Sequence, residues 1–448
     1  MGRRASALAL VPAAAFPVLF LHVRYQPKVT FGAGSTTVGI ELSDVAVLAV
    51  VAAGAWAAFR AGWSPLRASR LLWALEALLL GLVVAATLHP VLWQDHYRFL
   101  KHLVTAAKFC EYGLLAPALA LLLRARAEAL PLLVVAVAWS VAASGWGLLQ
   151  FCGLVSELEG KRPLQREPSF LGIHDFAALS AAALALALGI LVLSPAEPRE
   201  RALAFVAAPA GAVGLMLSGA VAGAVGLALA ALAALGVARA RQGATLRRAA
   251  VILVLAGAAA GGLLLMRSGD VPQGIRDLGI GSKPKPSTQP DVQSYVQRSL
   301  LAYIGLRIFG DHPVIGVGWQ GSEEPENFEP YLPAAHRRYP AAPEIAFPSP
   351  KHEWGVQNAY LQTLTDLGLV GFAVLVAFFV TAAVLGVRAG LRGPPGVVPL
   401  AGLLWLLVAA GVWNGLGLVA GIPLDALTWI AVGLIGAATA WTTQVADG

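Results

Sequence analysis

The sequence has few charged residues and only two cysteines. Asp, Glu, Lys and Arg make up 13% of the chain, whereas soluble domains carry about 25%. Hydrophobic residues make up 58%, and the mean hydropathy is +0.71. These values exclude an ordinary soluble domain, and we interpret the chain as an all-α polytopic membrane protein.

The sequence also lacks the motifs of several metal-dependent enzymes. It contains no Asp-x-Asp of a metal-dependent glycosyltransferase and no His-Glu-x-x-His of a zinc hydrolase. Cys110 and Cys152 lie far apart in apolar segments, which favours small core residues over a disulfide or a metal site. We therefore predict no metal and no cofactor.

Twelve apolar runs approach the roughly 20 residues that a helix needs to cross a bilayer. The first follows Arg3 and Arg4, but it lacks a small-residue cleavage site and is interpreted as a retained span. The seventh and eighth are one stretch divided at Ser218 and Gly219. The predicted spans are residues 6–22, 45–59, 71–88, 103–123, 130–154, 170–193, 202–219, 220–238, 251–266, 367–387, 397–421 and 424–443. Within the fourth, Lys108 and Glu111 are spaced to pair on one helix face.

Arginines cluster in alternate loops, which predicts the orientation. The clusters are Arg3 and Arg4; Arg60, Arg67 and Arg70; Arg124 and Arg126; Arg199 and Arg201; Arg239, Arg241, Arg247 and Arg248; and Arg388 and Arg392. By the positive-inside rule these loops and both termini are cytoplasmic. The net charge of +7 has the same origin, and nucleic acid is not predicted as a partner.

The chain is thus predicted to have three parts. Residues 1–266 form spans one to nine, residues 267–366 form a large outward-facing loop, and residues 367–448 form the last three spans. Inside the loop, apolar residues recur at helical spacing over residues 291–309, with Arg298 and Arg307 off the apolar stripe. A second short helix is predicted over about residues 356–366.

Three segments carry a resemblance to a known family. Residues 298–319, reading RSLLAYIGLRIFGDHPVIGVGW, resemble a block of the O-antigen ligase and O-antigen polymerase superfamily, in which an arginine precedes an "hPllGvG" element. Residues 357–371, reading QNAYLQTLTDLGLVG, resemble its next block, "HNxYLQxLxExGxxG". Residues 166–176, reading REPSFLGIHDF, contain a Glu-Pro-Ser element that is similar to that of the polymerase members, where ligases more often have Pro-Asn.

The resemblance implies a membrane glycosyltransferase of the GT-C type in the bacterial inner (plasma) membrane. Its donor would be a glycan linked through a diphosphate to a polyprenol, and its acceptor a glycan or a lipid, with inversion at the anomeric carbon. The loop of residues 267–366 would face the periplasm or the cell exterior, and membrane lipids would surround the spans. A flippase and a chain-length regulator are the partners that such a polymerase would have.

The reaction sets demands that particular residues can meet. A departing diphosphate needs cations, and arginine grips phosphate in a bidentate way. Arg298 is therefore predicted as the first phosphate clamp and Arg166 as the second. The acceptor hydroxyl needs a base, for which Glu167 and His352 are the first candidates, with His174, Asp175 and Glu353 behind them. The residues predicted to bind substrate are His174, Asp175, Arg307, His312, Gln357 and Asn358.

Two positions depart from the ligase pattern. The histidine of the "HN" block falls on Gln357, and the arginine of an "SGxR" element falls on Val221. These departures and the Glu-Pro-Ser element favour a polymerase of repeat units over a ligase that transfers finished glycan. A twelve-span secondary transporter is the alternative from another class, but the chain has no internal repeat and its largest loop is late. A non-enzymatic scaffold would explain none of the three segments.

Overall fold

The fold is described from a computed structural model. It describes residues 7–33, 36–94, 97–156, 158–159, 163–193, 198–242, 250, 254, 256–259, 261–263, 294–393 and 396–446. The helices are α1 (Val11–Leu19), α2 (Leu42–Ala61), α3 (Ser64–Arg67), α4 (Arg70–Leu88), α5 (Phe99–Gly113), α6 (Leu115–Leu122), α7 (Arg126–Phe151), α8 (Ile173–Val192), α9 (Pro198–Ser218), α10 (Val221–Gln242), α13 (Ser294–Asp311), α14 (Pro325–Phe328), α15 (Leu332–Arg338), α16 (Ala359–Arg392), α17 (Val398–Trp413) and α18 (Pro423–Ala446). The strands are β1 (Lys28–Ala33) and β2 (Thr36–Glu41).

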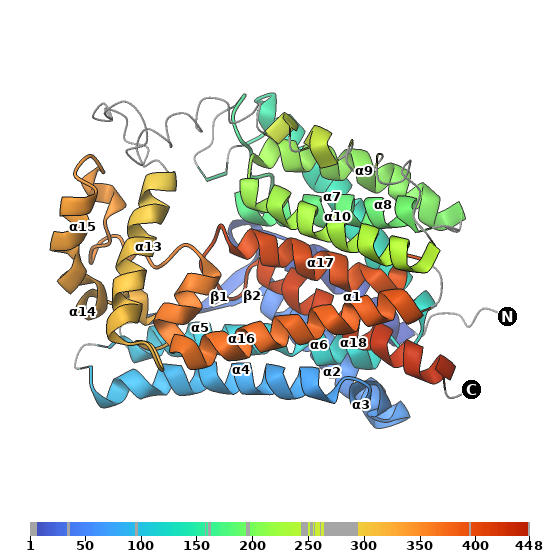
Figure 1. The fold of residues 1–448 in the computed structure, drawn as a ribbon, viewed down its shortest axis with the longest axis horizontal. Coiled ribbons are helices and arrows are strands. Elements are labelled where there is room, and N and C mark those ends of the chain that lie inside the picture. The colour runs from blue at the N-terminus through green and yellow to red at the C-terminus, as the bar shows by residue number, and fades with distance from the viewer. Residues whose placement is uncertain are drawn as a thin grey trace.

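The helices confirm an all-α polytopic membrane protein. Within the described residues, nine helical stretches are long and apolar enough to cross a membrane. Two further predicted spans correspond to shorter apolar helices, Ala7–Leu19 and Val398–Trp413. The ninth predicted span, residues 251–266, lies largely outside the described residues. Figure 1 shows most of the long helices side by side, with α13, α14 and α15 at one end of the bundle and α3 at the other.

A hairpin between the short helix α1 and the first long helix, α2, is a feature that the sequence did not predict. β1 and β2 pair antiparallel, with Lys28 opposite Glu41. The hairpin leads directly into α2, whose first turn lies beside α5. There Lys108 forms ion pairs with Glu41 (3.3 Å) and Asp44 (3.4 Å). Lys108 thus forms its ion pairs with carboxylates of β2 and α2, and its charge also acts on Glu111, the partner that the sequence predicts.

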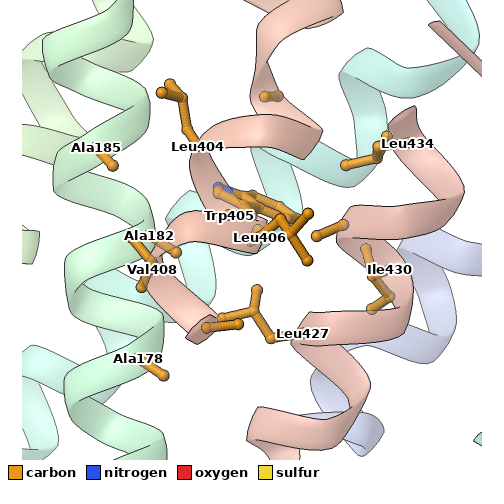
Figure 2. Close-up of a cluster of buried hydrophobic side chains, with 14 of the residues drawn as sticks. Ala178, Ala182, Ala185, Leu404, Trp405, Leu406, Val408, Leu427, Ile430 and Leu434 are labelled. Atoms are coloured by element: carbon orange, nitrogen blue, oxygen red, sulfur yellow. The ribbon is translucent and has the colours of Figure 1, made fainter. Parts of the chain in front are cut away.

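The centre of the bundle is formed by α8, α17 and α18. The apolar windows of α8 and α18 are 94% and 100% buried, which leaves the surrounding helices to face lipid. Figure 2 shows Trp405 and Leu406 of α17 between the alanines of α8 and Leu427 and Ile430 of α18. Ala178, Ala182 and Ala185 line the facing side of α8. Small side chains allow such close packing of helices inside a membrane.

Helix α16 is broken at Gly368, whose φ of 64° and ψ of −165° are not helical. A Cβ at this position would lie 2.3 Å from the carbonyl oxygen of Val314, so only glycine fits. The break separates a short first segment of α16 from the remainder, which is long enough to span the membrane. The short segment corresponds to the predicted second loop helix.

The segment Pro313 to Gly318 supplies hydrogen bonds to both sides of this break. Val317 N–H donates to the carbonyl of Thr365 (3.1 Å), and Gly318 N–H donates to that of Asp366 (2.9 Å). Leu369 N–H donates in turn to the carbonyl of Pro313 (2.8 Å). Main-chain groups freed at the break are thus satisfied, which a helix at membrane depth requires.

The loop elements form a small core of their own. The apolar stripe of α13 confirms the predicted amphipathic helix, and it packs against the following segments of the loop. The buried members are Leu300, Leu301, Ile304, Ile308, Val317, Phe328, Ala335 and Phe347. Thr365 Oγ1 also donates to the carbonyl of Gly305 (3.3 Å), which fixes α13 against the first segment of α16.

Charged residues join this loop domain to α5. Glu324 lies 2.5 Å from His102 Nε2 and 2.9 Å from Arg98 Nε, and its side chain is only 4% exposed. Glu353 pairs with Arg98 and, at 2.7 Å, with Lys101. Burial alone would raise the pKa of Glu324, but hydrogen bonds and charge from His102 and Arg98 outweigh it and lower the pKa. The ionised carboxylate therefore stabilises the docked loop.

Replacing Glu324 by Gln is expected to lower the free energy of unfolding by about 2 kcal/mol, because two charge-assisted hydrogen bonds are lost. Since the folded-state pKa is lowered, this stabilisation is complete above the unfolded-state pKa of roughly 4.3 and is lost as the pH falls through the folded-state value. The melting temperature of E324Q in detergent should therefore lie below that of the wild type at pH 6 and approach it at pH 3.5.

Glu326→Gln is the matched control, since Glu326 is an exposed carboxylate of the same loop. A gap between E324Q and wild type that stays constant from pH 6 to pH 3.5, or an equal loss in E326Q, would contradict the interpretation.

Candidate functional site

The predicted site residues His174 and Asp175 lie in the first turn of α8. Gly172 precedes the helix with a φ of 103°. Asp175 is buried, and its Oδ1 accepts a hydrogen bond from Leu424 N–H at 2.8 Å. Asp175 thereby joins the start of α8 to the start of α18. His174 is half-buried and points elsewhere, into contact with the loop domain.

Arg298 of α13 meets His174 and Gln357. Its Nη2 lies 3.0 Å from His174 Nε2, and its Nε donates to Gln357 Oε1 at 3.4 Å. Because a guanidinium can only donate, His174 Nε2 accepts, and the neutral imidazole then carries its proton on Nδ1. Three predicted residues from separate parts of the chain therefore form one polar cluster.

Asn358 extends this cluster to the end of α17. Its Oδ1 accepts from Leu361 N–H (3.0 Å) and so caps α16, while its amide donates to Asn414 Oδ1 (2.7 Å). Asn414 was missed from the sequence, where it is one amide inside the predicted span of residues 397–421. A methyl group placed on its neighbour Gly415 would lie 3.6 Å from His174 Cε1 and 2.9 Å from Ala222 Cβ. The start of α10 is therefore close to His174 as well.

Arg166 lies against the turn between α9 and α10. A Cβ on Gly219 would lie 2.4 Å from Arg166 Cδ, and Glu167 N–H donates to the carbonyl of Leu217 at 2.9 Å. Gly219 is two residues before Val221, the position that resembles the arginine position of "SGxR". The aliphatic part of an arginine from another segment thus packs against this turn. The Glu167 side chain is 1% exposed.

These contacts give the site the character of an anion-binding surface. The N-termini of α8, α10 and α16 meet there, and each carries the partial positive charge of a helix N-terminus. At α8 the carboxylate of Glu159 already accepts from Ile173 N–H at 3.4 Å. Arg298 adds a full positive charge beside His174, and Arg166 adds another beside the turn that leads into α10. A doubly charged phosphate group is the kind of ligand that such a surface stabilises.

The other predicted residues lie elsewhere. Arg307 is exposed on α13 and donates to Tyr303 Oη (3.4 Å). His312 stacks on Trp93, with ring centroids 6.1 Å apart. It follows the other end of α13, roughly 20 Å from Arg298 at the rise of an α-helix. His352 contacts Ser349 and stacks on Trp354, and Glu353 is engaged by Arg98 and Lys101.

Comparison with known proteins identifies one domain. A family model described as O-antigen ligase matches residues 202–376. The match covers α10, α13 and the first part of α16, and so includes Arg298, Gln357 and Asn358. It confirms the resemblance that the sequence segments indicated. Among curated proteins, none matches the chain.

Asn358→Ala is expected to cost about 1 kcal/mol, because α16 loses its cap and Asn414 loses a partner. Asn414→Ala should cost less. The double variant should lose less than the sum, since both substitutions remove the same hydrogen bond. Thermal unfolding in detergent measures all three. Asn358→Asp keeps the cap and should fall between wild type and N358A, whereas strict additivity would contradict the coupling.

Proposed function

We propose, from the match to the O-antigen ligase family model over residues 202–376, that this protein is a membrane glycosyltransferase that elongates a polyprenyl-diphosphate-linked glycan at the outward face of a bacterial inner membrane. In this proposal a growing chain is transferred onto a new repeat unit. The observation that carries it is the contact between Arg298 and His174, in which a guanidinium, a group able to bind phosphate, lies 3.0 Å from an imidazole, a group able to accept a proton. A flippase and a chain-length regulator would be its partners, with no metal required.

In the proposed mechanism, the arginines and the helix N-termini stabilise the two negative charges of the diphosphate. The bond between the anomeric carbon and the diphosphate oxygen breaks, and the diphosphate leaves with the electron pair. The acceptor hydroxyl oxygen forms the new bond to the anomeric carbon from the opposite side, which gives inversion. Because diphosphate is a good leaving group, no general acid is needed.

His174 is the proposed base for the acceptor hydroxyl. Its Nε2 already acts as an acceptor, and its ring is half-buried and next to Arg298. Three of the other candidates are less well placed for this role, and Glu167 remains the second choice. Glu353 is held by Arg98 and Lys101, and Asp175 by Leu424 N–H. His352 contacts Ser349 and Trp354. The hydroxyl proton would move to His174 Nε2 once the diphosphate draws Arg298 away.

Polymerisation is favoured over ligation by three features. Gln357 replaces the histidine of the ligase block, and it contacts Arg298 as a hydrogen-bond acceptor. Val221 replaces the arginine of "SGxR", and Arg166 approaches the same turn from the Glu-Pro-Ser segment. In that segment Ser169 is buried, and its Oγ donates to the carbonyl of Ala143 (2.7 Å). The Glu-Pro-Ser element therefore holds Arg166 in place. This supports a role for Arg166 at the turn where the ligase pattern has the arginine of "SGxR". Ligation is the second candidate, because the matched domain is described as O-antigen ligase.

Arg298→Ala is expected to reduce transfer by about 10²- to 10³-fold, the loss typical of removing one group that stabilises developing charge. His174→Gln should reduce it by about 10²-fold or more, because an amide can accept from Arg298 but cannot take a proton. The purified variants are assayed for transfer in detergent. Arg337→Ala removes an exposed arginine of α15 and serves as the control. Wild-type rates in R298A or H174Q, with normal elution and melting, would contradict the assignment.

The polymerase assignment is tested with a lipid-diphosphate-linked repeat unit as the sole substrate. Purified protein in detergent should convert it into a ladder of longer lipid-linked oligomers, resolved by mass spectrometry. A ligase would leave this substrate unchanged and would transfer it only to an added lipid acceptor. That result would replace polymerisation by ligation while leaving the glycosyltransferase assignment intact.

A further inference from the structure

A pocket lies between α4 and α16 at the end of the bundle opposite the site. Ser69 and Arg70 line it from the start of α4, and Thr381, Val384 and Arg388 line it from α16. Figure 1 shows these two helices side by side, with the start of α4 next to α3. The pocket contains about 670 Å³ of space not filled by protein, part of it open to the surroundings. The volume that the centre of a water-sized sphere can reach is about 330 Å³, far more than the roughly 10–15 Å³ that one water needs on this measure.

The lining of the pocket changes from apolar to cationic along its length. Leu71, Val380 and Val384 are exposed apolar side chains on a span-forming stretch, so they face lipid. Arg70 and Arg388 stand at the end where the positive-inside rule predicts the cytoplasm. An apolar wall that leads to two guanidinium groups matches a phospholipid whose phosphate lies at the membrane surface. Basic pockets between helices on this side of a membrane bind anionic headgroups.

Ser69 provides an independent observation. It is 3% exposed and lines the pocket, and its Oγ has no hydrogen-bond partner among the described residues. Although Ser69 precedes α4, its side chain does not cap the helix. Buried hydroxyl groups almost always have a partner. The hydroxyl lies just beneath the pocket wall, with less than 1 Å² of its own surface accessible, so a change of its rotamer is needed before a phosphate oxygen at the positive end of α4 can accept from it.

We propose that this pocket binds the headgroup of an anionic phospholipid from the inner leaflet, with Arg70, Arg388 and Ser69 holding its phosphate. The site is independent of glycosyl transfer. The apolar wall distinguishes a lipid from soluble phosphate, because only a lipid has acyl chains to cover Leu71 and Val380. The lipid would join α4, on the lipid-facing side of the bundle, to the inner end of α16.

Native mass spectrometry of the purified protein with added phosphatidylglycerol or phosphatidylcholine tests the proposal. We expect wild-type protein to retain one phosphatidylglycerol in preference to phosphatidylcholine. R70Q/R388Q should weaken phosphatidylglycerol binding on the order of thirtyfold, and S69A by about tenfold. The matched control R67Q/R392Q removes two exposed arginines from the same end of the molecule that do not line the pocket, and it should bind like the wild type.

Three outcomes would overturn the proposal. Equal weakening in R70Q/R388Q and R67Q/R392Q would mean a diffuse attraction to surface charge. Equal retention of phosphatidylcholine and phosphatidylglycerol by the wild type would mean that the pocket does not select charge. Inorganic phosphate alone raising the melting temperature of the wild type but not of R70Q/R388Q would mean that the ligand is a soluble anion. Because none of these measurements uses transfer activity, they are separate from the tests of the enzyme.

Discussion

The arrangement of this protein depends on how the main-chain groups at the break in α16 are satisfied. An unpaired N–H or C=O at membrane depth costs several kcal/mol. The break at Gly368 frees carbonyls of Thr365 and Asp366, and residues 313–318 donate to them. This segment follows α13 directly, so the same hydrogen bonds fix the position of α13 on the bundle. Arg298 can meet His174 only because its helix is held there.

The loop domain is held at a second place by charge. Arg98, Lys101 and His102 at the start of α5 engage Glu323, Glu324 and Glu353 of the loop. The two attachments act on different parts of the domain, one next to α16 and the other next to α14. Between them lies the small apolar core that α13 shares with the loop. The domain therefore presents its arginine from a framework fixed at both sides, although it is only an insertion between spans.

Hydropathy was enough to predict the spans, and helical spacing was enough to predict α13, because both patterns are local. Contacts between distant segments were not predictable in this way. Arg298 and His174 are separated by 124 residues, and neither carries a local signal of the other. Asn414 lies inside the predicted span of residues 397–421, with no local signal of its polar contact, and Lys108 forms ion pairs with residues more than 60 positions away in the sequence. The hairpin of β1 and β2 was not predicted, because its six-residue strands are too short to register as spans and lie in a loop that was considered only for its charged residues.

The contact between Arg298 and His174 has a consequence for the order of events in the proposed reaction. The imidazole nitrogen that would accept a proton is engaged by the guanidinium at 3.0 Å. A diphosphate competes for that guanidinium and releases the nitrogen as it binds. The donor would then have to arrive before the acceptor could be deprotonated. An ordered mechanism of this kind keeps the base inactive toward water until a glycan is in place, and so limits wasteful hydrolysis of a costly lipid-linked intermediate.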